Sequence, residues 1–177
     1  MPRYVAFLRA INVGGHTVKM DRLRALFEAL SFASVETVIA SGNVLFDTRA
    51  KDMSALERKI ERHLEPALGY AVATFVRAQA DLDTVLTAHP FGTIEASHTL
   101  TVSFLKDAPP AHVVATLVAL ETPTDRLHVS GRELYWHTHG RMSDSTLFGV
   151  SFEKMLRQQS TSRNIKTVQR LGAKARA

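Results

Sequence analysis

The sequence has no cysteine, one tryptophan and no apolar run near the roughly 20 residues that a membrane-spanning helix requires. Without cysteine there is no disulfide framework, no thiolate nucleophile and no cysteine-ligated zinc site. The first apolar segment, Tyr4–Leu8, is too short for the core of a secretion signal, and no small-residue cleavage site follows it. We therefore expect a cytoplasmic protein with no membrane partner.

Acidic residues are also absent from residues 154–177, which contain seven basic residues. Residues 1–153 hold 15 basic and 17 acidic groups, so the net charge of +5 comes from the C-terminal segment. On a helix, Arg163, Lys166, Arg170 and Lys174 would form one basic stripe. Such a stripe suits an anionic partner, and a solvated helix face is the other interpretation.

Several catalytic signatures are missing as well. The sequence has no phosphate-binding P-loop, no dinucleotide-binding glycine motif and no nucleophile elbow, and no carboxylate pair is singled out by its spacing. His137 and His139 would share a strand face as half of a metal site, but the spacing does not name a third ligand. We assign no metal, no cofactor and no reaction from these patterns.

Hydrophobic periodicity predicts the element order β-α-β-β-α-β for the first half of the chain. A capping box, Ser54 with Glu57, would begin its second helix, and Gly69 would end it. This order is typical of the ferredoxin-like fold, in which the first and third strands pair antiparallel at the sheet centre. The predicted strands are 3–9, 35–39, 43–47 and 71–77; the predicted helices are 20–30, 54–68 and 81–88.

The second half predicts β-α-β-β-α, followed by a last helix. Its strands are 99–105, 127–130 and 133–138, and its helices start at Pro110 and span 146–158, with Phe148 on the apolar face. The last helix would run over 163–171, capped by Ser162 and ended by Gly172. We expect an α+β fold of two similar ferredoxin-like halves packed together, with domains at 1–92 and 98–177.

The candidate binding site lies where three predicted loops converge at one end of the N-terminal sheet. Arginine and lysine would supply charge, paired glycines would let a ligand approach the backbone, and polar side chains would orient it. A second segment places hydroxyls and an arginine at a predicted helix N-terminus. The candidate residues are Arg9, Asn12, Gly14, Gly15, Lys19, Ser41 and Asn43, together with Thr161, Arg163 and Asn164.

Three classes of function remain open for these residues. The leading hypothesis is a protein that binds a phosphorylated or other small anionic ligand. A nucleic-acid-binding module that uses the C-terminal basic stripe is the alternative, with an affinity that falls steeply with salt. An enzyme acting on a small anionic substrate is the third class, and it would need an acid–base group beside Arg9. The oligomeric state is not predicted, and neither is whether the two site segments meet.

The same segments resemble a bacterial family, the domain of unknown function 1697. The resemblance implies a two-part α+β protein and assigns no activity. The sequence departs from the family pattern at Ala10, where glycine is usual, at His89, where asparagine is common, and at Ile165, where an aromatic residue is common. The matching blocks are residues 6–15, Met20 with Leu23-Arg24, residues 41–46, Pro90-Phe91, and residues 161–164 with Thr167-Val168.

Overall fold

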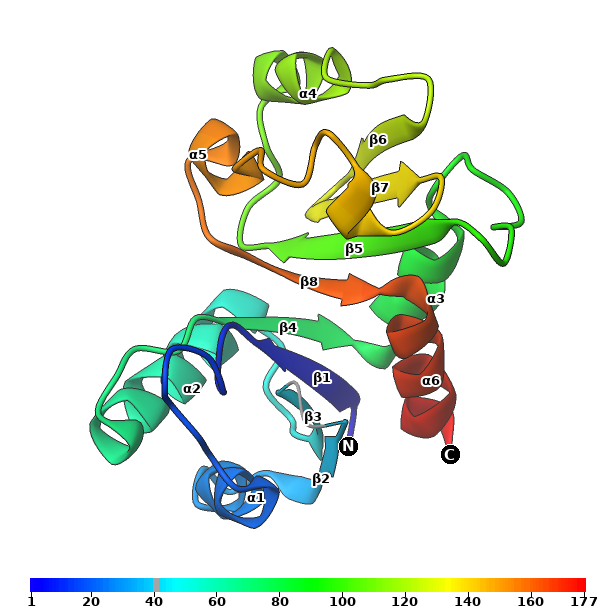
Figure 1. Ribbon diagram of the computed structural model, residues 1–177. Helices are drawn as coiled ribbons and strands as arrows, with labels where there is room; N and C mark the ends of the chain where they lie inside the picture. Colours follow the sequence, from blue (N-terminus) through cyan, green and yellow to red (C-terminus); the bar gives the residue numbers. More distant parts are fainter. Residues whose placement is uncertain (40–41) are drawn as a thin grey trace. The chain divides into compact units, whose positions relative to one another are not determined.

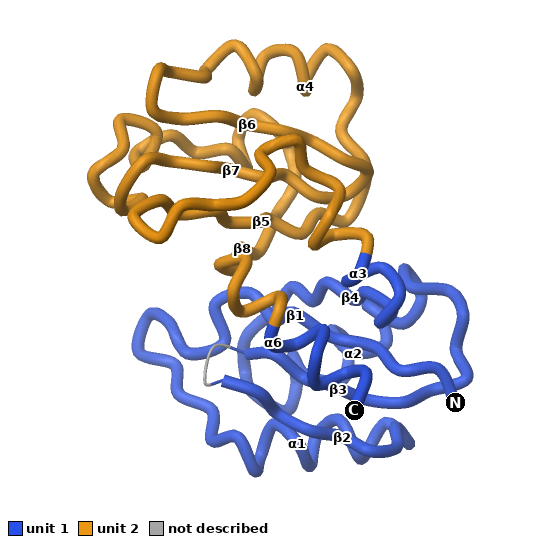
Figure 2. Tube along the Cα trace, turned by 90° about the vertical axis from the view of Figure 1, so that its right-hand side faces the viewer, with its two compact units in different colours: residues 1–83, 170–177 blue, residues 84–169 orange. Residues whose placement is uncertain are grey.

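The protein is described here by a computed structural model that covers residues 1–39 and 42–177. The chain forms two compact units, each built around one four-stranded antiparallel sheet (Figures 1 and 2). Unit 1 comprises residues 1–83 and 170–177, and unit 2 comprises residues 84–169. The domain limits expected from the sequence place residues 170–177 in the other half. The described helices include none that is long and apolar enough to cross a bilayer.

Unit 1 has the predicted element order and the ferredoxin-like topology. Its sheet has the strand order β2-β3-β1-β4, and β1 pairs antiparallel with both β3 and β4. Residues Tyr4–Leu8 are almost fully buried on both faces of the sheet, as their apolar pattern predicted for a central strand. The elements are β1 (Arg3–Leu8), α1 (Met20–Glu28), β2 (Ala33–Val38), β3 (Asn43–Asp47), α2 (Met53–Leu68) and β4 (Thr74–Ala78).

Helices α1 and α2 of unit 1 each pack an apolar stripe on the sheet. Leu23 and Phe27 of α1 are buried, and the ring of Phe27 lies 5.7 Å from that of Phe46 on β3. Leu56, Ile60 and Leu64 form the buried stripe of α2. At roughly 1.5–3 kcal/mol for each large apolar side chain buried, these two stripes hold the helices on the sheet.

Of the two predicted ends of α2, the C-terminal one is correct and the N-terminal one is wrong. Gly69 ends the helix in a left-handed conformation, with φ of 84°, as predicted. The capping box at Ser54 is wrong, because the side chain of Asp52 accepts a hydrogen bond from Ala55 N at 3.0 Å and so caps the helix two residues earlier. Asp and Ser are nearly equal in capping strength, so local sequence could not choose between them.

Unit 2 repeats the topology of unit 1. Its strand order is β6-β7-β5-β8, with β5 paired antiparallel to both β7 and β8. A helix labelled α3 (Gln79–Thr87) and an irregular connector lead into it, and its helices pack Leu117 and Leu156 against Leu127 and Trp136. The elements are β5 (Thr99–Leu105), α4 (Ala111–Val118), β6 (Asp125–Ser130), β7 (Glu133–Thr138), a 3-10 turn η1 (Met142–Asp144), α5 (Phe152–Leu156) and β8 (Ser160–Asn164).

The C-terminal third contains the main errors of the sequence prediction. Residues 160–164 form strand β8 and not a helix start, because the open edge of β5 provides a partner for their backbone. Helix α6 (Ile165–Arg176) therefore begins later and continues through Gly172. The helix predicted over 146–158 is reduced to α5, which Arg157 ends in a left-handed conformation, and Phe148 is 60% exposed.

Candidate functional site

The loop from Arg9 to Lys19, which joins β1 to α1, is anchored at three points within unit 1. Arg9 N donates to Ala73 O at 2.9 Å, and Asn12 Oδ1 accepts from Val18 N at 2.8 Å. The hydroxyl of Tyr70 donates to the carbonyl of Ile11 at 2.8 Å. These bonds hold both ends of the segment 12–18 while its middle remains exposed. The ends of the loop are thus held in place, and the exposed part lies between them.

Gly14 and Gly15 lie in the exposed middle of this loop. Both have a left-handed backbone, with φ of 67° and 83°, and an added Cβ would meet no atom within 4 Å at either position. The glycines are therefore needed for backbone conformation and not for packing, and the surface over them is open. His16, which no sequence pattern singled out, lies beside them with its ring stacked on Tyr70 at 3.8 Å between centroids.

Lys19 occupies the N-cap position of α1. Its side chain is exposed and makes no capping hydrogen bond. The first turn of α1 contains one acid, Asp21, which is paired with Arg24 at 3.1 Å. Lys19 therefore adds positive charge at the end of the helix where the dipole is also positive. This arrangement does not stabilise the helix, but it favours the binding of an anion at this end.

The β2–β3 hairpin does meet the loop after β1, as predicted. Leu8 N donates to Gly42 O at 2.8 Å, and a Cβ on Gly42 would lie 2.8 Å from Ile11 Cγ2. Asn43, however, is 1% exposed, and its Nδ2 donates to Val38 O at 3.1 Å. The side-chain amide of Asn43 is thus buried and hydrogen-bonded within the hairpin. Ser41 lies outside the described residues.

The second predicted segment, in unit 2, is engaged largely within its own strand and the following helix. The guanidinium of Arg163 donates to Thr161 Oγ1 at 2.7 Å and to the carbonyl of Ser162 at 2.9 Å. Burial lowers the pKa of Arg163 to about 10, so the side chain remains charged at neutral pH. Asn164 Oδ1 accepts from Lys166 N at 2.9 Å, as a helix cap, and Asn164 also lines a cavity of about 580 Å³ in unit 2.

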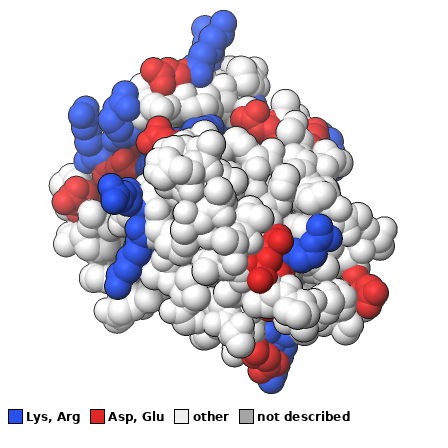
Figure 3. Space-filling model, turned by 90° about the horizontal axis from the view of Figure 1, so that it is seen from above, with Lys and Arg blue, Asp and Glu red and all other residues white. Residues whose placement is uncertain are grey.

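The basic stripe predicted on the last helix is partly neutralised. Lys174 is paired with Glu36, and Arg176 with Asp83, in each case inside unit 1. Lys166 and Arg170 are exposed. On the face seen from above in Figure 3, basic and acidic side chains both occur among a larger area of uncharged residues. The stripe is therefore weaker as a nucleic-acid surface than the sequence predicts.

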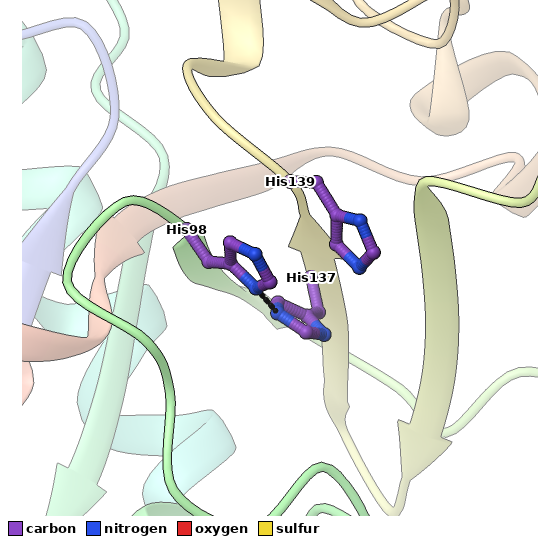
Figure 4. Close-up of side chains that lie close together, drawn as sticks. All are labelled: His98, His137 and His139. Carbon is purple, nitrogen blue, oxygen red and sulfur yellow. Dashed lines mark hydrogen bonds between the residues drawn. The ribbon is translucent and has the colours of Figure 1, made fainter.

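A histidine cluster in unit 2 extends the half-site that the sequence predicts at His137 and His139. His98 lies beside His137 and His139, and a ring nitrogen of each lies within 4.8 Å of the others (Figure 4). His98 is 39 residues before His137, so no local motif could name it as the third member. Only the pairing of β5 with β7 places it there.

The fold and these sites define a two-unit α+β protein with ferredoxin-like sheets. The chain belongs to the family described as protein of unknown function (DUF1697), whose sequence profile matches residues 1–135. The structure of conserved bacterial protein SP0830 from Streptococcus pneumoniae is similar over 98% of both chains, with a TM-score of 0.76 and 24% sequence identity. That similarity concerns the fold alone. None of the curated proteins matches the chain.

Proposed function

We propose that the protein binds a small anionic ligand at the loop between β1 and α1. The observation that supports this proposal is the combination of three backbone anchors with an exposed Gly14-Gly15 turn. A loop that is already fixed loses little conformational entropy when a ligand binds. The open glycine backbone gives access to N–H donors, which oxyanions accept readily.

The charge for this ligand would come from Arg9 and Lys19, with His16 as a further donor. Arg9 is half-buried at the end of β1, and Lys19 and His16 are exposed. Hydrogen bonds to charged groups contribute about 1.5–3 kcal/mol each, so removing one side chain should lower the affinity by about tenfold or more. Asn43 is not part of this proposal, since its amide is used inside the hairpin.

Thermal melting with inorganic phosphate tests the proposal, with sodium chloride holding the ionic strength constant. A ligand at about 100 times its dissociation constant adds about 2.7 kcal/mol, or roughly 5–10 °C for a chain of this size. At the same phosphate concentration, a tenfold loss of affinity in Lys19→Ala should remove about half of the shift. Lys51→Ala is the matched control, because Lys51 is an exposed lysine just before the N-cap of α2. Equal shifts in both variants would contradict the assignment.

Short RNA, measured at low and high salt, separates this proposal from the nucleic-acid alternative. If only RNA raises the melting temperature, and high salt removes that effect, the binding site would be assigned to α6 instead. Lys166→Ala with Arg170→Ala is the suitable variant for that arm. Deleting the chain after Gln159 is not, because it would remove β8, a paired strand of the unit 2 sheet.

A further inference from the structure

Three histidines of unit 2 face one another at the point where β7 ends and β5 begins (Figure 4). His98 Nδ1 lies 3.1 Å from His137 Nε2. The ring of His98 stacks on that of His139, with 4.2 Å between centroids, so each ring contacts both of the others. No other group of three or more potential metal ligands is found among residues 1–39 and 42–177.

We propose that His98, His137 and His139 together bind one divalent transition-metal ion such as Zn²⁺. In a tetrahedral site with Zn–N bonds of 2.0–2.1 Å, neighbouring ligand nitrogens lie about 3.3 Å apart. The distance of 3.1 Å between the His98 and His137 nitrogens is close to that value. One ring nitrogen from each of the three histidines lies within 4.8 Å of the others, which places the three rings close enough to share one ion.

The backbone around the three residues is held by hydrogen bonds. Leu100 is the register partner of His137 across the β5–β7 pair, which brings His98 next to His139. Thr99 Oγ1 donates to Gly140 O at 2.7 Å, and His139 N donates to Thr124 O at 3.0 Å. A site preorganised in this way binds a metal more tightly than one formed by free loops.

Glu95 selects the tautomer of His98 that a metal requires. Its carboxylate lies 3.4 Å from His98 Nε2, and its carbonyl accepts from His98 N at 2.9 Å. A proton on Nε2 facing the carboxylate leaves the lone pair of Nδ1 directed at the cluster. Carboxylates that bond the outer nitrogen of a histidine are a regular feature of metal sites, where they orient the ring and raise its basicity.

His137 is the buried member of the cluster. The residue is 9% exposed, and its Nδ1 has no hydrogen-bond partner among the described residues. This nitrogen is not the one that faces His98, so Nε2 of His137 would hold the metal and Nδ1 would point away from it.

The ligand set determines which metals fit. Three imidazoles without a thiolate favour Zn²⁺, Co²⁺, Ni²⁺ or Cu²⁺ over Mg²⁺ and Ca²⁺, which prefer oxygen. His139 is exposed, so a fourth position would face solvent. Three protein ligands with an open position are typical of zinc sites that bind a water molecule or a small ligand.

The test is a titration of the untagged full chain with Co²⁺ after treatment with a chelator. We expect one equivalent to bind, with the visible absorption of nitrogen-ligated cobalt, and Zn²⁺ to displace it. His139→Ala should weaken Co²⁺ binding by more than about 100-fold, the upper end for changes in the outer shell. His139 and His98 are better targets than the buried His137, whose replacement would also disturb folding.

His112→Ala is the matched control, because His112 is an exposed histidine on α4 outside the cluster. It should bind Co²⁺ like the wild type, while His98→Ala and His139→Ala lose the absorption. The melting temperatures of the metal-free variants show that each is folded. Absence of a Co²⁺ spectrum in the wild type would overturn the proposal, and so would a spectrum that both variants of the cluster retain.

Discussion

The indole N–H of Trp136 donates to the buried carboxylate of Asp125 at 2.8 Å. Ser145 Oγ donates to the same oxygen at 2.6 Å, and the hydroxyls of Thr122 and Thr124 donate to the other oxygen at 3.0 Å. Burial acts to raise the pKa of Asp125, but the hydrogen bonds outweigh it and hold the pKa well below the usual value of 3.8. The charged carboxylate is therefore a structural centre of unit 2.

The low pKa of Asp125 predicts that the protein loses stability in acid. A group whose pKa is lower in the folded state contributes stability above its unfolded pKa, and that contribution is lost as the pH falls toward the folded value. The unfolding free energy should thus decrease below about pH 4. Asp125→Asn should cost about 2–3 kcal/mol at pH 7, because it removes charged hydrogen bonds, and should flatten this part of the pH dependence.

Urea denaturation followed by tryptophan fluorescence measures both effects, since Trp136 is the one tryptophan in the chain. Asp144→Asn is a suitable control, because Asp144 is exposed and pairs with Arg141 in a single turn. The prediction is wrong if the two variants lose equal stability at pH 7.

Ala10 has a left-handed backbone, with φ of 53°, in the loop after β1. This conformation costs about 1–2 kcal/mol for a residue with a Cβ. Ala10→Gly should raise the unfolding free energy by about 0.5 kcal/mol, because relief of strain exceeds the greater freedom of glycine in the unfolded chain. Chemical denaturation measures the change; a loss of stability would show that the backbone at Ala10 is not strained.

Gly42 and Gly14 share a positive φ but differ in their surroundings. A Cβ on Gly42 would lie 2.8 Å from Ile11 Cγ2 and 3.1 Å from Leu8 Cβ, whereas one on Gly14 meets no atom within 4 Å. Gly14→Ala should cost about 1 kcal/mol from backbone strain alone. Gly42→Ala should cost about 2 kcal/mol more from overpacking. Equal losses in the two variants would contradict this account.

Glu95→Gln tests how the proposed metal site is organised. Removing the charge that faces His98 Nε2 should weaken Co²⁺ binding by about 10-fold, the lower end for outer-shell changes, because Glu95 is largely exposed. Glu133→Gln is the control, because Glu133 is an acid at the start of β7 and lies outside the cluster. If Glu95→Gln binds Co²⁺ with unchanged affinity, Glu95 does not contribute to the site. The three histidines are tested separately by their own variants.

Several features of the candidate sites could be predicted from the sequence because they depend on neighbouring residues. The glycine pair indicated the exposed loop between β1 and α1. The spacing of His137 and His139 indicated that the two lie close together, although β7 ends at Thr138 and His139 follows the strand. Asn43 shows the limit of such reasoning. An asparagine in a turn is normally exposed, yet here the packing of β2 against β3 buries it. Residue type gives the chemistry of a side chain but not its solvent access.

The sequence by itself determined the elements whose signals are local. The apolar run of β1 made it a central strand, and Gly69 ended α2. Only the tertiary structure decided that residues 160–164 form a strand, because their backbone pairs with β5, more than 50 residues earlier. It likewise decided that His98 joins His137 and His139, through the register of β5 on β7. Strand pairing joins distant segments through backbone hydrogen bonds that carry no side-chain signature, so no local pattern records them.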